Sequence, residues 1–256
     1  MFDFKIRPFT TKSEQGNTIR GIVVTPKEFT GKLPAIVMSH EFCANMWTTF
    51  RYARKVVNDG YACFCYDFTR SGSGISGGSS VGMSAVQESR DVVSVFNYAK
   101  SQSFVDTSNI TLWGCSQGGM ATSLVAPELE DQITKIILYY PALSICDDAR
   151  KGSMITARFD PKNPPEKFWC AIVHVAKNYC TDVIDLDPYE QICKFSKPVL
   201  LIHGNKDHIV NVSYSREAAA KYPNCEFHEF PAEHLWIGGG AKKAVEITRE
   251  FLAKNK

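Results

Sequence analysis

The sequence predicts an α/β fold built on a mostly parallel, doubly wound sheet. Short continuous apolar runs, typical of strands buried on both faces, occur at 33–40, 61–68, 109–114, 135–142 and 198–204. Helix-compatible segments separate most of these runs, so strand and helix alternate along the chain, as expected when helices cover both faces of a sheet. A length of 256 residues suits one such unit, and we expect a single domain over 1–256.

The first half of the chain carries turn signals between its predicted elements. The expected elements are strands at about 2–9, 18–25, 33–40 and 61–68 and helices at 46–59 and 84–101. Gly60 ends the first helix, because glycine commonly follows the last helical residue. A glycine- and serine-rich loop at 69–82 precedes the second helix.

The second half repeats the alternation with one interruption. The expected elements are strands at 109–114, 135–142, 198–204 and 225–230, a helix from Gln117, and a closing amphipathic helix at 241–255. Pro127 should shorten the helix that starts at Gln117. The interval of about 143–196 is too long for a simple crossover and too apolar for a linker. We expect it to form a short cap inserted over the carboxyl edge of the sheet.

Composition and charge exclude several classes of protein. Hydrophobic residues make up 44% and charged residues 22% of the chain, which is ordinary for a globular protein. The net charge is +2 and the basic residues are scattered, so we expect neither nucleic acid nor a membrane as partner. The apolar runs all fall short of the roughly 20 residues that a membrane span needs. The Gly72–Gly77 match to G-x-G-x-x-G lacks an immediate helix and a following acid, so we expect no dinucleotide cofactor.

The cysteines and the N-terminal residues bear on the cellular compartment. Nine cysteines stand at irregular spacings, several inside apolar runs and none in a C-x-x-C pair. This pattern favours buried thiols in a reducing compartment and gives no support to a metal site. The first residues lack a basic segment followed by an apolar one, so we expect a cytoplasmic location.

Ser116 stands between a predicted strand and a predicted helix, in the sequence "GCSQGG" at 114–119. That context is what a G-x-S-x-G nucleophile elbow requires, whereas the alternative role is a helix N-cap. Asp207 and His234 follow later strands, and ligands of open parallel sheets bind at the carboxyl ends of the strands. The order Ser, Asp, His is that of the α/β hydrolases. The sequence therefore predicts a nucleophilic serine activated by a histidine base, with an aspartate that orients the base.

Other histidines and acids compete for these roles. His228 lies inside the last strand, and we expect it to be a strand-face residue. His40 and His203 end buried strands and should satisfy backbone groups. The remaining histidines are His174 in the predicted cap and His208 in a turn. Asp147 and Asp148 follow the strand at 135–142, where some hydrolases carry their acid, but Asp207 is the better candidate.

Several motifs carry a family resemblance. They are "SHEF" at 39–42, "GSGISGG" at 72–78, "GCSQGG" at 114–119, "YPA" at 140–142, "FDPKNPP" at 159–165, "NY" at 178–179, "KPVLLIHGNKD" at 197–207 and "AEH" at 232–234. From about residue 33 onward the chain resembles the α/β-hydrolase serine esterases, and most closely the bacterial cinnamoyl (feruloyl) esterases. The resemblance implies Ser116, Asp207 and His234 as a catalytic triad, with the backbone N–H groups of Phe42 and Gln117 as oxyanion hole.

The resemblance also implies a substrate class and shows one departure. Asp148 and Tyr179 match positions that hold the phenolic end of a hydroxycinnamate, and Trp169 is a candidate to pack its ring. Glu41 stands where the family has glycine, so we expect its side chain to point away from the oxyanion hole or activity to be reduced or specialised. The cap sequence is divergent and keeps little beyond Tyr179.

The predicted function is a serine carboxylesterase that acts through an acyl-enzyme on hydroxycinnamate esters. It needs no metal or organic cofactor, and its partner is a small-molecule ester. A general short-chain acyl esterase, a thioesterase or a peptidase of the same fold remains an alternative, as does a catalytically silent hydrolase-fold binding protein. The sequence leaves a homodimer open.

Overall fold

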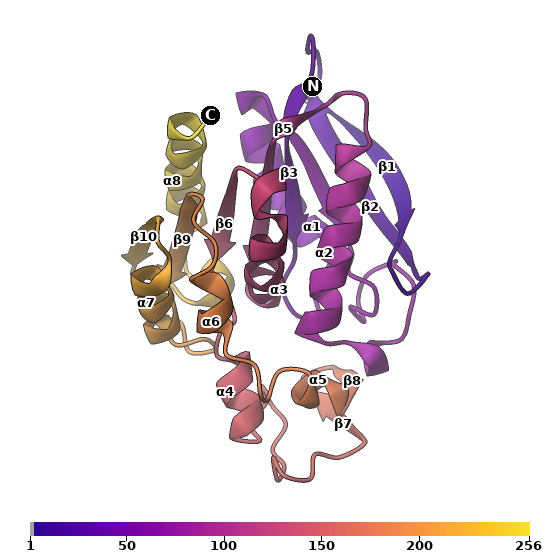
Figure 1. Cartoon of the computed structure of the whole chain (residues 1–256), viewed down its shortest axis with the longest axis vertical. Coiled ribbons are helices and arrows are strands. Elements are labelled where there is room, and N and C mark those ends of the chain that lie inside the picture. The colour runs from indigo at the N-terminus through magenta and orange to yellow at the C-terminus, as the bar shows by residue number, and fades with distance from the viewer. Residues whose placement is uncertain (1–2) are drawn as a thin grey trace.

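The computed structural model describes residues 3–256 and shows a central sheet flanked by helices (Figure 1). Within that range eight strands form one sheet in the order β1-β2-β4-β3-β5-β6-β9-β10. Their bounds are β1 Phe4–Lys12, β2 Thr18–Pro26, β3 Leu33–Ser39, β4 Ala62–Tyr66, β5 Val105–Cys115, β6 Lys135–Tyr139, β9 Val199–Gly204 and β10 Cys225–Phe230. The β1–β2 and β2–β4 pairs are antiparallel, and the remaining five pairs of this sheet are parallel. The predicted α/β-hydrolase fold is confirmed, although residue 2 of the first predicted strand lies outside the described residues.

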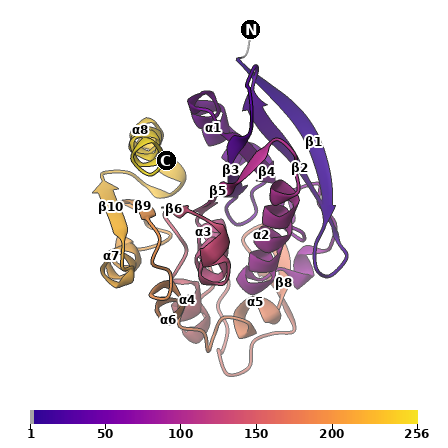
Figure 2. The same ribbon diagram turned by 45° about the horizontal axis from the view of Figure 1, so that its top comes forward.

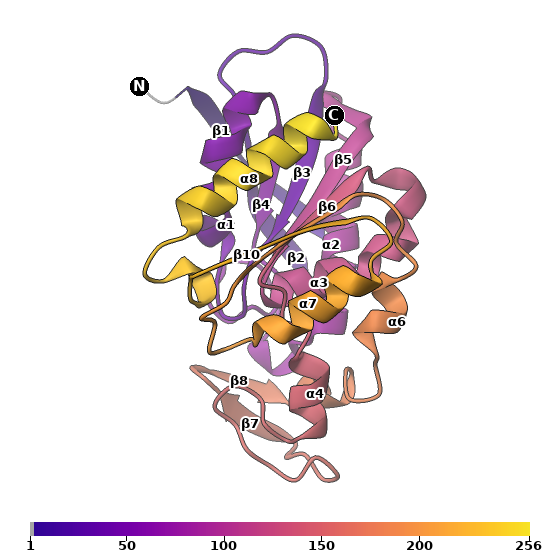
Figure 3. The ribbon, with the colours of Figure 1, turned by 90° about the vertical axis from the view of Figure 1, so that its left-hand side faces the viewer.

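Helices cover the sheet on both faces (Figures 2 and 3). Their bounds are α1 Met46–Val56, α2 Ala85–Lys100, α3 Gln117–Val125, α7 Val212–Lys221 and α8 Ala241–Lys254. α1 and α8 lie over one face, and α2, α3 and α7 lie over the other. α3 stops at Val125, and a short 3-10 helix with Pro127 in its first turn follows, as predicted. α7 was not among the predicted elements.

The buried strands divide their side chains between two hydrophobic cores because successive residues of a strand point to opposite faces. In β3, Ala35 and Val37 join the core beneath α2 and α3. Ile36 and Met38 join the core beneath α1 and α8. This two-sided burial explains why the strands appear in the sequence as continuous apolar runs instead of alternating ones.

The segment between β6 and β9 contains short elements only. They are α4 Ile145–Arg150, β7 Lys167–Cys170, β8 Val173–Ala176, α5 Asn178–Thr181 and α6 Pro188–Ile192. α4, α5 and the antiparallel β7–β8 pair lie beyond the ends of the central strands, at the bottom of Figure 1. That the segment between β6 and β9 acts as a cap stays a prediction. Within residues 3–256, every helix falls short of the length and apolar character needed to traverse a bilayer.

Candidate active site

Ser116 lies at a sharp turn between β5 and α3. Its backbone has φ 50 and ψ −117, a conformation that costs a non-glycine residue of order 1–3 kcal/mol. Neighbouring backbone groups hold it there: the Ser116 N–H donates to the Tyr139 carbonyl at 2.9 Å, and the Ser116 carbonyl accepts from Ala142 N at 2.9 Å. A Cβ on Gly114 would collide with the carbonyl of Gly118. The turn therefore presents the Ser116 hydroxyl at the end of the strand, as a nucleophile elbow does.

His234 connects Ser116 to Asp207. His234 Nε2 lies 3.0 Å from Ser116 Oγ, and His234 Nδ1 lies 2.6 Å from Asp207 Oδ2. All three residues are buried. Because an ionised carboxylate only accepts hydrogen bonds, the short contact places a proton on Nδ1 and leaves Nε2 free to accept the serine proton. The structure thus brings together the three residues that the sequence singled out.

Asp207 is held as a carboxylate by its surroundings. Burial alone would raise the pKa of Asp207, but hydrogen bonds from His203 and His234 lower it well below its ordinary value. The backbone N–H groups of Ile209 and Val210 also donate to its Oδ1, each at 2.9 Å. A charged Asp207 fixes the tautomer of the base and can stabilise its protonated form.

His203 also hydrogen-bonds to the carboxylate of Asp207, a role that was not predicted from the sequence. Its Nε2 lies 3.1 Å from Asp207 Oδ2 and 3.0 Å from the Val210 carbonyl, and its Nδ1 lies 2.6 Å from Ser215 Oγ. A carbonyl only accepts, so Nε2 carries the proton and donates to both oxygens. The contact with Val210 agrees with the expected role in satisfying a backbone group, whereas the contact with Asp207 adds a positioning role. In the sequence, the only hint of this contact is that His203 precedes Asp207 by four residues in "HGNKD".

Among residues 3–256, His234 is the histidine whose ring nitrogen lies within hydrogen-bonding distance of Ser116 Oγ. His40 Nδ1 lies 2.7 Å from the Glu41 carbonyl and its Nε2 accepts from Phe68 N–H at 3.1 Å. Burial lowers the pKa of His40 and so favours its neutral form. His228 pairs with Glu226 on β10. Of the two remaining histidines, His174 lies on β8 and His208 lines the cavity described next.

A cavity of about 290 Å³ opens at Ser116. Phe42 and Gln117, the predicted oxyanion-hole residues, line it next to the serine. Asp148 and Tyr179, the predicted substrate-binding residues, line it as well. Apolar side chains form much of the wall, among them Ile145, Met154, Ile155 and Ile209. Four more polar residues also line it: Ser144, Ser153, Arg158 and His208. The cavity therefore combines the Ser116 hydroxyl, an apolar surface and several polar groups, of which Asp148 and Tyr179 are the predicted substrate-binding ones.

Trp169, the third predicted substrate-binding residue, is not among the residues that line this cavity, so its position does not support that role. It lies on β7, is 60% exposed, and its ring packs against that of His174 at a tilt of 38°, with centroids 3.9 Å apart. The preceding residue, Phe168, packs against the core and against Phe159. Neighbouring residues of a strand point in opposite directions, so an inward Phe168 requires an outward Trp169.

Glu88, Gln117 and Tyr179 form a buried hydrogen-bonded chain behind the serine. Gln117 Nε2 donates to Glu88 Oε2 at 2.8 Å, and the Tyr179 hydroxyl donates to Gln117 Oε1 at 2.7 Å. Burial raises the pKa of Tyr179 well above its ordinary value and raises the pKa of Glu88 to about 8. The chain fixes the side chain of Gln117, whose backbone N–H is the predicted oxyanion donor. Glu88 was not singled out from the sequence.

Glu41 is buried, and its carboxylate points away from the cavity. It accepts from Thr48 Oγ1 at 2.7 Å and from the Tyr140 hydroxyl at 2.9 Å. Arg51 lies 3.5 Å from the same carboxylate. The glutamate in place of the family's glycine thus has partners on α1 and after β6, and its charge does not face the predicted oxyanion hole.

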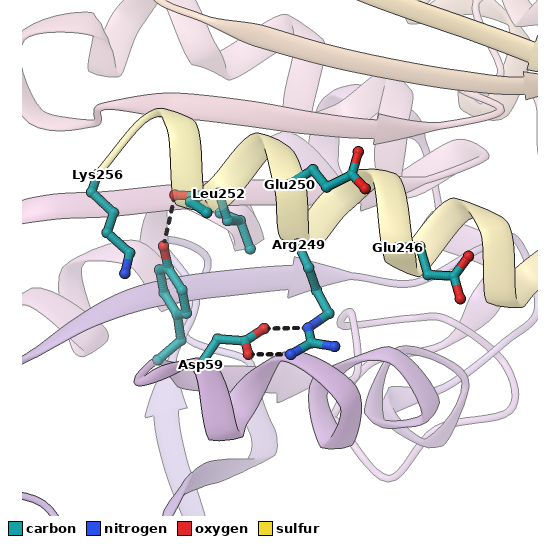
Figure 4. Close-up of a pocket in the computed structure, with 8 residues that line it drawn as sticks. Asp59, Glu246, Arg249, Glu250, Leu252 and Lys256 are labelled. Atoms are coloured by element: carbon teal, nitrogen blue, oxygen red, sulfur yellow. Dashed lines mark hydrogen bonds and ion pairs between the residues drawn. The ribbon is translucent and has the colours of Figure 1, made fainter.

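A second, larger cavity lies between α8 and the 3-10 helix that follows α1 (Figure 4). Its volume is about 420 Å³, and Asp59 and Arg249 pair inside it through two contacts of 2.6 Å. Serine, cysteine and histidine are absent from its described lining. The described lining therefore offers no serine or cysteine nucleophile and no histidine base, so chemistry is expected at Ser116. Among residues 3–256, no group of three or more histidine, cysteine or acidic side chains is placed to hold a metal ion.

Comparison with known proteins agrees with this geometry. Among solved structures, Est1E from Butyrivibrio proteoclasticus with ferulic acid bound superimposes with a TM-score of 0.89 at 25% identity, covering 96% of this chain and 98% of that one. The Pyrococcus furiosus esterase Pf2001 gives a TM-score of 0.74 at 18% identity over 99% of this chain and 91% of that one. That lower identity shows a shared fold alone. The fold and the site define an α/β hydrolase of the esterase type.

Sequence comparison gives the family. A profile of the prolyl oligopeptidase family matches residues 79–251, and the chain belongs to that family. It is 26% identical over 193 residues to alpha/beta hydrolase domain-containing protein 17C of Xenopus tropicalis, a match that covers 75% of this chain and 50% of that protein. The Homo sapiens protein of the same name gives the same identity over 193 residues, with 47% of its length covered. The chain thus spans about half the length of these curated relatives. Within the α/β-hydrolase esterases it resembles the bacterial feruloyl esterases.

Proposed function

We propose that this α/β hydrolase is a serine carboxylesterase that hydrolyses hydroxycinnamate esters through an acyl-enzyme. The observation that carries the proposal is the hydrogen-bonded series from Ser116 through His234 to Asp207, at a cavity that Asp148 and Tyr179 also line. The ferulic acid held by the structurally similar Est1E supports the acyl class. The partner is a small-molecule ester.

The reaction follows from the positions of the three residues. Ser116 Oγ attacks the ester carbonyl while His234 Nε2 takes its proton, and Asp207 stabilises the imidazolium. The backbone N–H groups of Phe42 and Gln117 donate to the oxyanion of the tetrahedral intermediate. His234 then gives its proton to the leaving alcohol. In the second half, water attacks the acyl-enzyme with His234 again as base.

Asp148 is the group that recognises a phenol in this proposal. Its Oδ2 accepts from Ser144 Oγ at 2.9 Å, which leaves Oδ1 for a ligand. Burial raises the pKa of Asp148 above its ordinary value, because the charge is poorly solvated. A phenolic O–H donor would stabilise that charge. The Tyr179 oxygen donates to Gln117 and keeps lone pairs that can accept a second hydroxyl.

The test compares the hydrolysis of methyl ferulate and methyl p-coumarate with that of methyl cinnamate, which lacks the phenolic hydroxyl. The short-chain ester p-nitrophenyl butyrate is the reference for all three. A site built to bind a hydroxyl discriminates strongly against analogues that lack it. We expect the wild type to prefer the hydroxylated esters, and Asp148→Asn to lose that preference at least tenfold in kcat/KM while hydrolysis of the butyrate ester is kept. Asp147→Asn is the matched control, since Asp147 bonds to Arg150 and Tyr214 outside this cavity.

The variant Tyr179→Phe distinguishes binding of the substrate phenol by Tyr179 from positioning of Gln117 by Tyr179. Selective loss of the hydroxylated esters would agree with a phenol-binding role, whereas equal loss on all esters would mean that Tyr179 acts only through Gln117. A wild type that prefers butyrate esters, thioesters or peptides would replace the hydroxycinnamate proposal by the corresponding hydrolase. A folded wild type inactive on every class would indicate a silent binding protein.

A further inference from the structure

Glu41 is a buried carboxylate that the proposed reaction does not use. It is 4% exposed and lies directly before Phe42, whose backbone N–H is the proposed oxyanion donor. Buried charges are rare in proteins unless they are paired and hydrogen-bonded. Its partners therefore indicate what the side chain does.

The loop between β3 and α1, residues 40–45, carries Phe42 and is called the oxyanion loop here. Two of the partners of Glu41 tie this loop to α1. Thr48 Oγ1 donates to Glu41 Oε2 at 2.7 Å, and Arg51 lies 3.5 Å from Oε1. The Arg51 guanidinium also lies over the Tyr52 ring, 4.6 Å from its centroid. α1 is anchored in turn by its packing on the sheet, where Tyr52 and Ala53 are buried. The carboxylate thus fastens a loop to a rigid element.

The third partner of Glu41, Tyr140, contacts the catalytic histidine His234. The Tyr140 hydroxyl donates to Glu41 Oε1 at 2.9 Å, and the Tyr140 ring packs on the His234 imidazole with centroids 4.7 Å apart. Burial raises the pKa of Tyr140 well above its ordinary value, so the hydroxyl keeps the proton it donates. The backbone of Tyr140 has φ 37, and its N–H donates to the Ile202 carbonyl at 2.7 Å. The ring is therefore held from both ends.

We propose that Glu41 is a positioning residue that couples the oxyanion loop to the catalytic histidine through Tyr140. This inference rests on the proposed function of Ser116, Asp207 and His234. Loss of the carboxylate would remove the 2.9 Å acceptor of the Tyr140 hydroxyl and leave it the Tyr52 hydroxyl at 3.4 Å, whereas Thr48 Oγ1 keeps the Asn45 carbonyl at 2.9 Å. A buried hydroxyl with a poorer acceptor is costly, so Tyr140 is expected to shift. The Phe42 N–H and the His234 ring would then be free to shift, and small misplacements of catalytic groups lower the rate steeply. Glu41 itself does not line the cavity at Ser116, so substrate binding should change little.

The test uses Glu41→Ala, Glu41→Gln and Tyr140→Phe in the full chain, with steady-state kinetics on the best ester found for the wild type. We expect Glu41→Ala to lower kcat about tenfold or more with KM within about twofold, because loop and ring move but the acyl pocket does not. Glu41→Gln keeps an oxygen for Tyr140 and should recover most of kcat. The double variant Glu41→Ala/Tyr140→Phe should be no slower than Glu41→Ala, because both changes break one connection.

Two further readouts separate this inference from the proposed function. The rate at which a fluorophosphonate probe labels Ser116 reports the catalytic machinery without an ester. The downfield proton resonance of the His234 Nδ1–H, bonded to Asp207, needs no activity at all. We expect slower labelling and a broadened resonance in Glu41→Ala, with both restored in Glu41→Gln.

The outcomes are distinct. A wild type that neither labels nor hydrolyses would overturn the proposed function, and the histidine resonance would still test the coupling. Labelling and resonance equal to the wild type in Glu41→Ala would overturn the positioning role. So would a loss in Glu41→Ala that Glu41→Gln does not recover, or a change confined to KM or to the melting temperature.

Discussion

At the scale of single residues, Asp207 receives donors on both of its carboxylate oxygens. Oδ2 accepts from His234 and His203, and Oδ1 accepts from two backbone N–H groups. The two oxygens therefore have different tasks. Oδ1 fixes the carboxylate to its own loop, and Oδ2 orients the imidazole.

Asp207→Asn is expected to lower kcat by about a thousandfold or more while the fold is kept. The amide oxygen can still accept from the loop N–H groups, but the amide nitrogen would then face His234 Nδ1–H, donor against donor. The imidazole would turn or change tautomer and could no longer accept the serine proton. Steady-state hydrolysis and a thermal melt measure the two effects. A variant within tenfold of the wild type would contradict the assigned role of Asp207.

The order and spacing of residues predicted Ser116, Asp207 and His234, because each follows a strand at the same edge of the sheet. The sequence could not predict the partners of Glu41. Tyr140 lies 99 positions further along the chain, and its contact depends on the direction of two side chains in the folded protein. For the same reason His203 was assigned only to the backbone, although it also bonds to Asp207.

At the scale of elements, α2 carries a carboxyl group into the space behind α3. Burial raises the pKa of Glu88 from 4.5 to about 8, so the group is protonated in the folded protein at neutral pH and ionised in the unfolded chain. Between these values the unfolded state binds fewer protons, and stability must fall as the pH rises. The penalty is absent below pH 4.5 and complete above about pH 8.

Glu88→Gln should therefore gain stability relative to the wild type as the pH rises from 5 to 8, by up to about 1.4 kcal/mol per pH unit. Urea unfolding at several pH values measures the difference. Glu128→Gln is the control, because a hydrogen bond from Arg90 lowers the pKa of that exposed carboxylate. Parallel stability curves for wild type and Glu88→Gln would show that Glu88 is ionised in the folded state.

The strand β7 gives a second test at this scale. Trp169→Ala should change kcat/KM less than about twofold on all esters, since exposed substitutions away from a site have small effects. Met154→Ala is the comparison: Met154 is buried and lines the cavity at Ser116, so its loss should raise KM for aromatic esters. A large effect of Trp169→Ala on hydroxycinnamates alone would return Trp169 to the substrate site.

At the scale of the whole molecule, the sheet and most of its two helical layers were predicted, whereas the segment 143–196 was predicted as a cap without its own helices and strands. The buried strands have a strong apolar signal because both their faces are covered. The strands β7 and β8 have four residues each, too few for a periodicity to be recognised. The direction of Trp169 could not be derived without knowing which face of that hairpin meets the core.

The central claim is that Ser116 is the nucleophile of an acyl-enzyme. Intact-mass analysis after a fluorophosphonate probe, followed by peptide mapping, tests it most directly. The account predicts one probe per chain, located on Ser116, with no labelling of Ser116→Ala and much slower labelling of His234→Ala. Labelling of the folded wild type at another residue, or none at all, would contradict it.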